Sequence, residues 1–321
     1  MPEVIAIGEL LIDFVSIEKD VPLVELPRFQ GAAGGAPPNV AVGLARLGVS
    51  AGFIGKVGDD PFGEFLRRTL EQEGVETIGL RTARGARTTL AFVATRSDGR
   101  KDITFYRNPG ADMLLVADEV DREYLTSARL VQFGSVSLSR PPAREATLEA
   151  VEAARKAGVL VSYDPNWRPS LWDDAVEARG VIWEGMALAH VVHCAQEEWE
   201  FITGTADLAA GAARIMEQGP SLVVVTQGER GCYFDNGEAR GQVPGFAVEA
   251  VDTLGAGDAF VAGMLCRLLR LPSVGGRSEG ELRAAMVYAN AAGALACTKR
   301  GVIPALPTAQ EVDAFLDSKR T

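Results

Sequence analysis

Short apolar segments alternate with amphipathic ones along the second half of the chain. Runs rich in β-branched and apolar residues predict buried strands at 130–133, 159–163, 190–194 and 222–226. The segments between and around these strands carry apolar residues at helical spacing and predict helices at 141–156, 175–185, 197–203 and 208–218. Strands that alternate with helices build a mainly parallel sheet, so an α/β fold with a central sheet sandwiched by helices is expected.

The first third of the chain follows a different pattern. It predicts strands at 4–8, 10–17 and 51–54, and helices at 37–47 and from 61 to about 72. These strands and helices do not alternate strictly. Two further strands, 88–95 and 102–106, are joined as a hairpin by Ser97-Asp98-Gly99. We therefore expect a small β-sheet lid formed by segments about 10–36 and 86–110. No repeat or linker interrupts residues 1–321, which favours a single domain that carries this lid.

Composition limits the partners of this chain. The formal net charge is −11 and the pI is about 4.9, so nonspecific attraction to nucleic acid or to an anionic membrane is disfavoured. We find no signal peptide and no apolar run long enough to cross a bilayer. The cysteines are widely spaced in apolar contexts, which predicts buried free thiols and a reducing, cytoplasmic setting for Cys194, Cys232, Cys266 and Cys297.

Histidine is scarce, which excludes two kinds of site. His190 and His193 lie three apart in a predicted strand, so their side chains point to opposite faces and a metal-binding pair is not expected. A Ser/His/Asp hydrolase also has no obvious histidine to use here.

The segment from Asp252 to Asp258 is the most informative part of the sequence. A glycine-rich turn precedes an apolar helix that is expected to start near Ala256. Gly255 and Gly257 leave room for a ligand to approach the unpaired amides of the first turn, which form an anion site. Asp258 lies beside that anion and within reach of an attacking hydroxyl, as phosphoryl transfer requires. The alternative is an ordinary turn with a capping aspartate.

A second glycine-rich segment, 31–39, precedes the first long helix. Glycines followed by proline are common at helix starts, so this signal is weak by itself. Asp13 is more unusual, because a carboxylate inside an apolar strand needs a partner or a ligand. Together with Asn39 and the backbone at Gly34 and Gly35, Asp13 predicts a site that reads sugar hydroxyls.

Four motifs in this order resemble the ribokinase-type (PfkB) carbohydrate kinases. They are Gly8-Glu9 with Asp13, Gly34-Gly35 with Asn39, the segment 55–63, and Asp252 with Gly255-Ala256-Gly257-Asp258. The resemblance runs from about residue 4 to 315, which is nearly the whole chain. Within the family the chain looks most like the fructokinases, through segments 105–112, 164–172 and 300–308. The 2-keto-3-deoxygluconate kinases share Tyr106-Arg107 and Arg168, so the two groups are hard to separate.

The resemblance implies a ribokinase-like fold and assigns roles to individual residues. Asp258 would be the catalytic base, and the amides of Gly255, Ala256 and Gly257 would form the anion hole for the transferring phosphate. The sugar would be held by Asp13, Gly34, Gly35 and Asn39. Arg107 and Arg168 would reach the substrate or the phosphate, with surface ion pairing as the alternative for both.

The resemblance also implies where the nucleotide binds. Thr226, Gly228 and Gly231 follow a buried strand and match the family's nucleotide loop, although a plain β-turn explains these glycines equally well. Gly257 would approach the phosphates, and Asn290 lies on the helix that flanks the adenine in the family. The small neighbours of Asn290 also suit ordinary helix packing.

Two kinds of cation are implied. Many family members hold a monovalent cation through backbone carbonyls, and the resemblance implies K⁺ for this chain. The corresponding residues are Asp252, Leu254, Ala296, Lys299, Gly301 and Ala305. Mg²⁺ would be organised indirectly, through water, by Glu198. The family's Asn-x-x-Glu motif has Ala195 at its Asn position, so this chain departs from the family pattern there.

These observations predict an ATP-dependent, Mg²⁺-requiring sugar kinase that phosphorylates a hydroxymethyl group, with D-fructose as the favoured substrate and fructose 6-phosphate as product. Two alternatives stay open: a 2-keto-3-deoxygluconate kinase, and a sugar-sensing protein on the same fold that has lost catalysis. Small-molecule sugar and ATP are the expected partners. A homodimer through the lid is a further hypothesis, because exposed lid strands offer edges for pairing.

Overall fold

The central feature of the fold is a large, mainly parallel sheet, seen in a computed structural model that describes residues 1–96, 101–271 and 278–319. Its strand order is β13-β12-β11-β10-β9-β8-β1-β4-β5. The seven strands from β11 to β5 pair in parallel, whereas β12 and β13 add an antiparallel hairpin at one edge. The strands are β1 (Val4–Ile7), β4 (Ala51–Gly58), β5 (Glu76–Ala83), β8 (Leu130–Gly134), β9 (Leu160–Asp164), β10 (Val191–Ala195), β11 (Leu222–Thr226), β12 (Cys232–Asp235) and β13 (Arg240–Val243).

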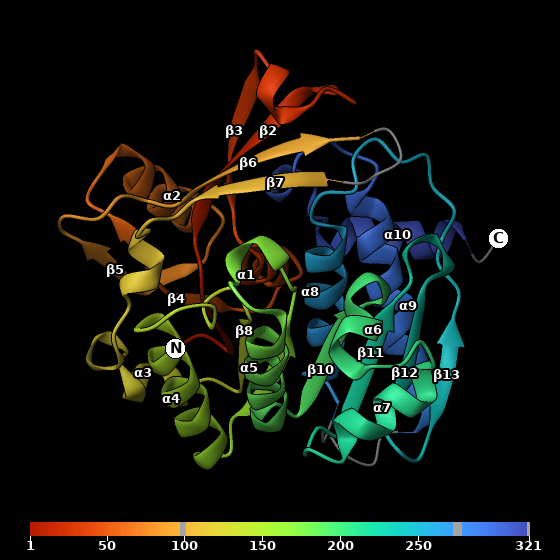
Figure 1. The fold of residues 1–321 in the computed structure, drawn as a ribbon. Helices are drawn as coiled ribbons and strands as arrows, with labels where there is room; N and C mark the ends of the chain where they lie inside the picture. The colour runs from red at the N-terminus through yellow and green to blue at the C-terminus, as the bar shows by residue number, and fades with distance from the viewer. Residues whose placement is uncertain (97–100, 272–277, 320–321) are drawn as a thin grey trace.

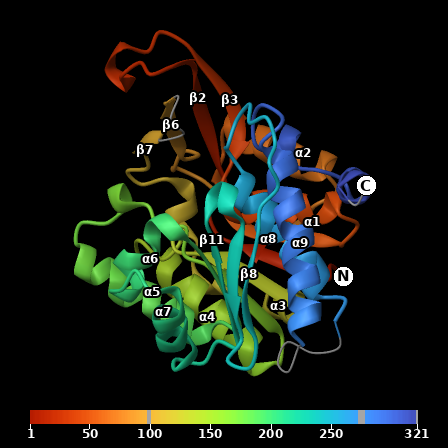
Figure 2. The ribbon, with the colours of Figure 1, turned by 90° about the vertical axis from the view of Figure 1, so that its right-hand side faces the viewer.

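Helices cover both faces of this sheet, as Figures 1 and 2 show. One face packs against α1 (Ala36–Arg46), α2 (Pro61–Gln72), α8 (Ala256–Leu268), α9 (Glu279–Ala296) and α10 (Ala309–Ser318). The other packs against α3 (Arg122–Thr126), α4 (Ala143–Lys156), α5 (Ala175–Leu188), α6 (Gln196–Thr203) and α7 (Leu208–Met216). The α/β architecture predicted from the sequence is therefore observed.

Alternate residues of each strand enter two separate cores. In β1, Val4 and Ala6 join the core beside α1 and α8, whereas Ile5 and Ile7 join the core on the opposite face. All four side chains are fully buried. Burial on both faces explains why these strands read as continuous apolar runs rather than as alternating patterns.

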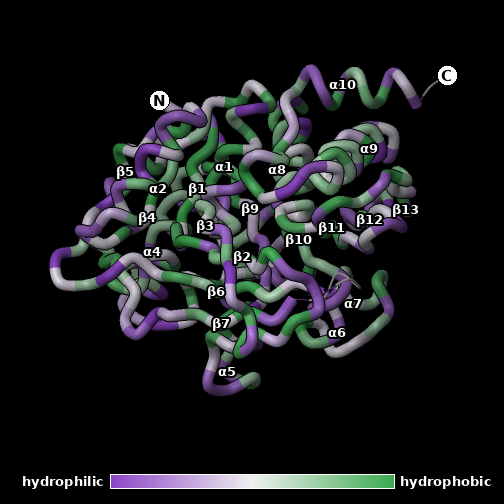
Figure 3. The backbone as a smooth tube through the Cα atoms, turned by 90° about the horizontal axis from the view of Figure 1, so that it is seen from above, coloured by the Kyte–Doolittle hydropathy of each residue, from purple (hydrophilic) through white to green (hydrophobic). Residues whose placement is uncertain are grey.

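A second, four-stranded sheet forms the lid. Its strand order is β3-β2-β6-β7, and its strands are β2 (Leu11–Lys19), β3 (Phe29–Gly34), β6 (Leu90–Thr95) and β7 (Lys101–Tyr106). The central pair β2–β6 is parallel, and the two outer pairs are antiparallel. Figure 1 shows these strands crossing above the main sheet, and Figure 3 shows them from above. The strands fall within the predicted lid segments, and we interpret the chain as one domain that carries this lid.

Some predicted boundaries differ from the observed ones. The strand expected at 190–194 runs from Val191 to Ala195, although the backbone amide of His190 donates to Val161 of the neighbouring strand. The strand expected at 51–54 continues to Gly58 through a segment that is buried throughout. The predicted turn Ser97-Asp98-Gly99 lies outside the described residues.

Candidate active site

The first turn of α8 forms an open corner built by two glycines. Gly255 is the N-cap residue with φ +75°, and a Cβ there would lie 2.5 Å from Val302 Cγ1, so only glycine fits. A Cβ added at Gly257 would meet no atom within 4 Å, which leaves this turn accessible to a ligand. Gly255 offers no side chain to cap the helix, so the first amides can bind an anion.

Asp258 lies in this first turn and is held by a residue from α1. The amide nitrogen Nδ2 of Asn39 donates to Asp258 Oδ2 over 2.8 Å. Burial raises the pKa of Asp258 to about 7; the Asn39 hydrogen bond, Arg168 and Lys101 lower it, and Asp164 raises it further. A carboxyl group that titrates near neutrality is well suited to accept a proton from a substrate hydroxyl.

Asn39 also has a buried oxygen atom without a hydrogen-bond partner in the described part of the chain. Its side chain is buried, and its Oδ1 atom has no hydrogen-bond partner among the described residues. Two prolines in the first positions of α1, Pro37 and Pro38, fix the helix start that places Asn39. The side chain can therefore orient Asp258 with its amide group and accept from a ligand with its oxygen.

Asp13 and the glycine pair form the facing wall, on the lid. A Cβ at Gly34 would lie 2.0 Å from Asp13 Oδ2, so the carboxyl group packs directly on the bare backbone. Gly35 has φ +109°, and a Cβ there would lie 2.5 Å from the carbonyl oxygen of Glu9. Burial raises the pKa of Asp13 to about 6, against the opposing charges of Arg168 and Lys101.

Two cations lie between these acidic groups. Arg168 follows β9, and its Nη1 atom donates to the carbonyl oxygens of Asn166 (3.3 Å) and Trp167 (3.2 Å). Lys101 comes from the start of β7 in the lid. Both charges lower the pKa of Asp13 and of Asp258, so the two cations lie close to both carboxyl groups. The structure thus brings Asp13, Asn39, Arg168 and Asp258 together, as predicted, and adds Lys101.

Arg107, a predicted substrate contact, has several partners within the chain. Its guanidinium pairs with Asp112 over 2.6 Å and donates to Ser139 Oγ (2.8 Å) and to the carbonyl oxygen of Val136 (3.2 Å). The side chain is only 5% exposed. These internal partners engage all three guanidinium nitrogens, so Arg107 supports the lid, and its contact with the substrate stays a prediction.

The predicted nucleotide loop lies against the segment that follows β13. Gly231 has φ +92°, and a Cβ there would lie 2.0 Å from the carbonyl oxygen of Val243, so the two segments touch through bare backbone. Asn290 supports the same segment, because its Nδ2 atom donates to the carbonyl oxygens of Val243 (3.2 Å) and Pro244 (3.1 Å). Gly228, with φ +59°, has open space around it and can approach a ligand.

A buried histidine that sequence reasoning passed over joins this loop to the centre of the site. His193 Nε2 lies 3.2 Å from the hydroxyl of Thr226, and Nδ1 lies 3.2 Å from Asp164 Oδ1. Burial lowers the pKa of His193, but Asp164, Glu198 and Asp258 outweigh it and raise the pKa overall. The only available sequence signal was a polar residue inside a buried strand.

Glu198, the predicted organiser of Mg²⁺, has two structural contacts. Its carboxylate accepts from the backbone amides of Ala195 (3.0 Å) and Trp167 (2.7 Å), which caps α6 and fixes the loop that carries Arg168. Burial and the nearby Asp164 raise the pKa of Glu198. No group of three or more His, Cys, Asp or Glu side chains in the described ranges is arranged to hold a metal ion.

Two segments of the predicted monovalent-cation site are held together by Asp252. Its carboxylate accepts from the amides of Leu254 (3.0 Å) and Gly301 (3.1 Å). Among the other predicted ligands, Ala296 ends α9, Ala305 ends a 3₁₀ turn (Ile303–Ala305), and the side chain of Lys299 pairs with Glu311 over 2.7 Å. The backbone of this corner therefore lies beside Gly255 and the anion site, where Val302 contacts it.

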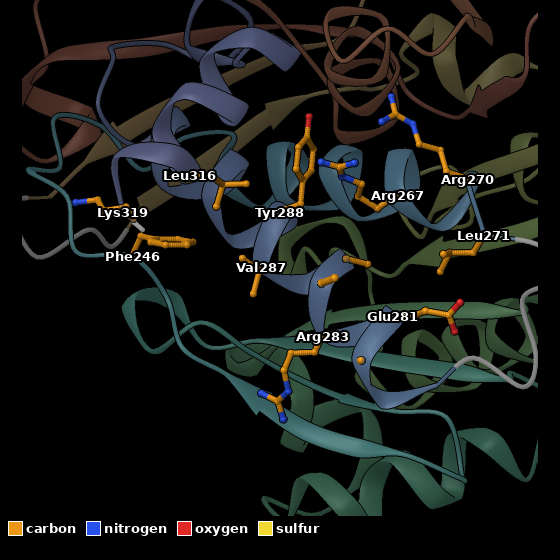
Figure 4. A pocket seen from close by; sticks show the side chains of 13 residues that line it. Phe246, Arg267, Arg270, Leu271, Glu281, Arg283, Val287, Tyr288, Leu316 and Lys319 are labelled. Carbon is orange, nitrogen blue, oxygen red and sulfur yellow. The ribbon is translucent and has the colours of Figure 1, made fainter. Parts of the chain in front are cut away.

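A cavity of about 700 Å³ lies elsewhere, beside α8, α9 and α10. None of the predicted site residues lines it. Figure 4 shows its wall, where Arg267 lies over the ring of Tyr288, 3.8 Å from the ring centroid. Arg267 is also 3.7 Å from Asp313. Arg267 already has partners within the chain. We therefore place the candidate active site at the polar groups around Asp258 and not at this cavity.

Two whole-chain predictions can be compared with the structure. All four cysteines are free; Cys194, Cys232 and Cys266 are buried, whereas Cys297 is half-buried. No helix in the described part of the chain is long and apolar enough to cross a membrane.

Comparison with known proteins identifies the family. The model of the family described as "pfkB family carbohydrate kinase" matches residues 1–309 of this chain. The chain belongs to this family of carbohydrate kinases. A probable fructokinase-4 of Arabidopsis thaliana is 45% identical over 314 residues, which cover 98% of this chain and 96% of that protein. The predicted membership of the PfkB family, and the greater likeness to fructokinases, are confirmed.

Solved structures of kinases share the fold. A fructokinase from Xylella fastidiosa with bound ATP has a TM-score of 0.91 and 34% identity, with 100% of both chains covered. A fructokinase from Vibrio cholerae O395 in a fructose, ADP and calcium ion bound form has a TM-score of 0.88 and 33% identity, covering 98% of this chain and 99% of that one. The ribokinase-like fold with a lid is confirmed for this carbohydrate kinase.

Proposed function

We propose that this kinase transfers the terminal phosphoryl group of ATP to D-fructose, giving fructose 6-phosphate. The observation that carries the proposal is the contact between Asn39 and Asp258 at the open first turn of α8. This contact supports a site in which Asp258 would be the base, the α8 amides would bind the anion, and Asn39 would face the sugar. Two relatives named as fructokinases, one with ATP bound and one with fructose and ADP bound, support the same substrates.

The geometry suggests how the chain's residues act. Asp13, Asn39 and the backbone at Gly34 and Gly35 would orient the sugar hydroxyls. Asp258 would accept the proton of the attacking hydroxymethyl group, and the amides of α8 would stabilise the negative charge on the transferring group. Bound ATP supplies the phosphoryl group. The glycine corner fits this group because no side chain of Gly255 or Gly257 stands in its way.

We test this role with Asp258→Asn, which keeps the shape of the side chain but cannot accept the proton. Turnover should fall by about 10³-fold or more, because base and orientation are lost together. Fructose affinity, measured by calorimetry, should change by less than about threefold. Turnover near the wild-type value in this variant would remove Asp258 from the mechanism.

A 2-keto-3-deoxygluconate kinase is the rival with some support in the structure. Arg168 lies close to Asp13 and is available to bind a substrate carboxylate. An ADP-release assay across fructose, ribose, 2-keto-3-deoxygluconate and no sugar separates the two. Fructose should give the highest kcat/KM, and a higher value for the keto acid would reassign the substrate.

We further propose Mg²⁺ and K⁺ as the ions of this enzyme. Mg²⁺ binds through nucleotide phosphates with few protein carboxylates, which suits a site where Glu198 is the nearby buried acid. K⁺ would bind the backbone corner that Asp252 holds together. A related fructokinase holds a calcium ion, which supports a cation requirement. We also place the enzyme in the cytoplasm, and the free cysteines support a reducing setting.

We propose that a second copy of this chain covers the outer face of the lid. Phe14 and Phe92 stack there with ring centroids 5.1 Å apart, and Tyr106 lies 5.3 Å from Phe92 and is 65% exposed. Because neighbouring residues of a strand face opposite sides, these rings point away from Asp13 and the sugar. The outer strands β3 and β7 also offer free edges of the lid sheet.

The oligomeric state tests this interface. Wild-type protein should sediment as a dimer, and Tyr106→Asp should sediment as a monomer with an unchanged circular dichroism spectrum. Ile78→Asp is a matched control, since Ile78 is 60% exposed on the main sheet, and it should stay dimeric. A monomeric wild type at micromolar concentration would rule the interface out.

A further inference from the structure

Lys101 begins the outer lid strand β7 on the face that looks toward the sugar site. In the lid register, Asp13 lies opposite Ala91, and Ala91 lies opposite Phe105. Phe105 and Lys101 are four residues apart in one strand, so both share the face of Asp13. Lys101 therefore extends the sugar-facing side of the lid beyond the residues that the sequence motifs mark.

The charges around Lys101 come from three different parts of the fold. Burial lowers the pKa of Lys101 and Arg168 lowers it further, whereas Asp252, Asp258 and Asp13 oppose this effect. Asp13 belongs to the lid, Arg168 to the loop after β9, and Asp252 and Asp258 to the start of α8. Lys101 is thus within electrostatic range of charged groups from the lid, from the loop after β9 and from the start of α8.

The two arginines that the sequence assigned to the site are held by contacts within the chain. Arg107 is buried in its pair with Asp112, and Arg168 is tied to the carbonyl oxygens of its own loop. Lys101 is carried by the lid and is half-buried. It can therefore bring positive charge to the corner from the side opposite the α8 amides.

We propose that Lys101 is a catalytic residue that contacts the phosphoryl group during its transfer to the sugar. This inference rests on the kinase function proposed above. The bond between the γ-phosphorus and the oxygen of ADP breaks as the sugar oxygen bonds to phosphorus, and the sugar proton passes to Asp258. Lys101 keeps its protons and donates hydrogen bonds to the equatorial oxygens, which carry the charge in this transition state.

The experiment compares Lys101→Met and Lys101→Arg with the control Lys19→Met. Lys19 also lies opposite Thr95 at the same end of the lid, on the other neighbouring strand, but it is exposed and belongs to β2. Steady-state kinetics give kcat and the KM for fructose. Calorimetry gives the affinity for ADP with aluminium fluoride in the presence of fructose, which mimics the transferring phosphoryl group.

Lys101→Met should lower kcat by roughly 100-fold, as loss of one charge-stabilising donor does, and should weaken the aluminium fluoride complex by a similar factor. The KM for fructose should change by less than about threefold. Lys101→Arg should recover at least about a tenth of the wild-type kcat, and Lys19→Met should match wild type.

Three results would overturn the role of Lys101: a Lys101→Met kcat within about threefold of wild type, a change confined to the KM for fructose, or an equal loss in Lys19→Met. A wild-type protein that transfers phosphate to none of the sugars would instead overturn the proposed function itself. The two failures are thereby distinguishable, because the first requires an active wild type.

Discussion

Asp258 is held between opposing electrostatic influences. Burial and the neighbouring Asp164 raise the pKa of its carboxyl group, while Asn39, Arg168 and Lys101 lower it, with a result of about 7. The helix start alone would favour the charged form. The base is therefore poised where small changes in its surroundings alter the fraction that can accept a proton.

The first residue-scale prediction concerns catalysis and pH. Because the protonated carboxyl cannot act as a base, kcat/KM for fructose should fall about tenfold per pH unit below a pH of about 7. The measurement is a pH series at constant ionic strength with saturating ATP. A rate that stays level down to pH 5.5 would contradict the assignment of Asp258 as the base.

The second residue-scale prediction concerns stability and pH. Asp258 has a usual pKa of 3.8 and a folded value of about 7, so the folded state holds the proton more tightly between these values. Stability from this group is complete below about pH 4 and is lost as the pH rises through about 7. Asp258→Asn should therefore raise Tm at pH 8 by about 2 °C, and less at pH 5. A lower Tm at pH 8 would oppose this reasoning.

The sequence predicts some residues of the site far better than others. Asp13, Asn39 and Asp258 were predicted because a polar side chain in an apolar strand or at a helix start requires a hydrogen-bond partner or a ligand. Lys101 gave no such signal, since a lysine in a polar hairpin is ordinary. Arg107 was predicted to reach the substrate, and nothing in the sequence indicated its buried ion pair with Asp112.

At the scale of elements, the strand β3 ends in a glycine pair whose lack of side chains shapes the sugar wall. A methyl group at Gly34 would occupy the place of the Asp13 carboxyl, and the lid strand β2 would have to shift. The buried side chain of Leu11 also lies 3.2 Å from that position, so there is little room to adjust. In the proposed function, sugar binding would therefore depend on the pairing of β2 with β3.

We predict that Gly34→Ala raises the KM for fructose by at least tenfold, because the displaced Asp13 no longer meets the sugar hydroxyls. The KM for ATP should change by less than about twofold, since the nucleotide loop is remote from β3. Gly180→Ala is the matched control, as a Cβ in that helix meets no atom within 4 Å, and it should match wild type. An unchanged KM for fructose in Gly34→Ala would show that Asp13 does not hold the sugar.

Elements of the main sheet were predictable because each consists of an apolar run with local helix signals beside it. The lid was recognisable as a separate set of strands, but its order was not. The central pair β2–β6 is parallel and joins segments almost eighty residues apart, as the Asp13 and Ala91 pairing shows. No local pattern in the sequence predicts which of two strands so far apart will pair.

At the scale of the whole molecule, the site is shared between the lid and the body. Asp13 and Lys101 come from the lid, whereas Asp258 and Arg168 come from the main domain. A ligand that bridges the two halves should favour their approach, and a second ligand then binds to an arrangement already formed.

We therefore predict positive coupling between fructose and a non-hydrolysable ATP analogue. Each should raise the affinity of the other by the same factor, about fivefold or more, because linkage is reciprocal. Calorimetric titration of each ligand with and without the other gives both factors. Independent binding, with a factor near one in both directions, would show that the lid does not couple the two sites.

The buried carboxylate of Asp112 contacts both ends of the lid hairpin formed by β6 and β7. Asp112 pairs with Arg107, directly after β7, and accepts from Thr89, directly before β6. Both strands of the hairpin are thus anchored to the same carboxylate at the end where they leave the lid. Lys101 stands five residues from the end of β7, a lever arm of about 17 Å at ~3.3 Å per residue. A tilt of roughly 10° there would carry its ammonium group about 3 Å, the length of a hydrogen bond.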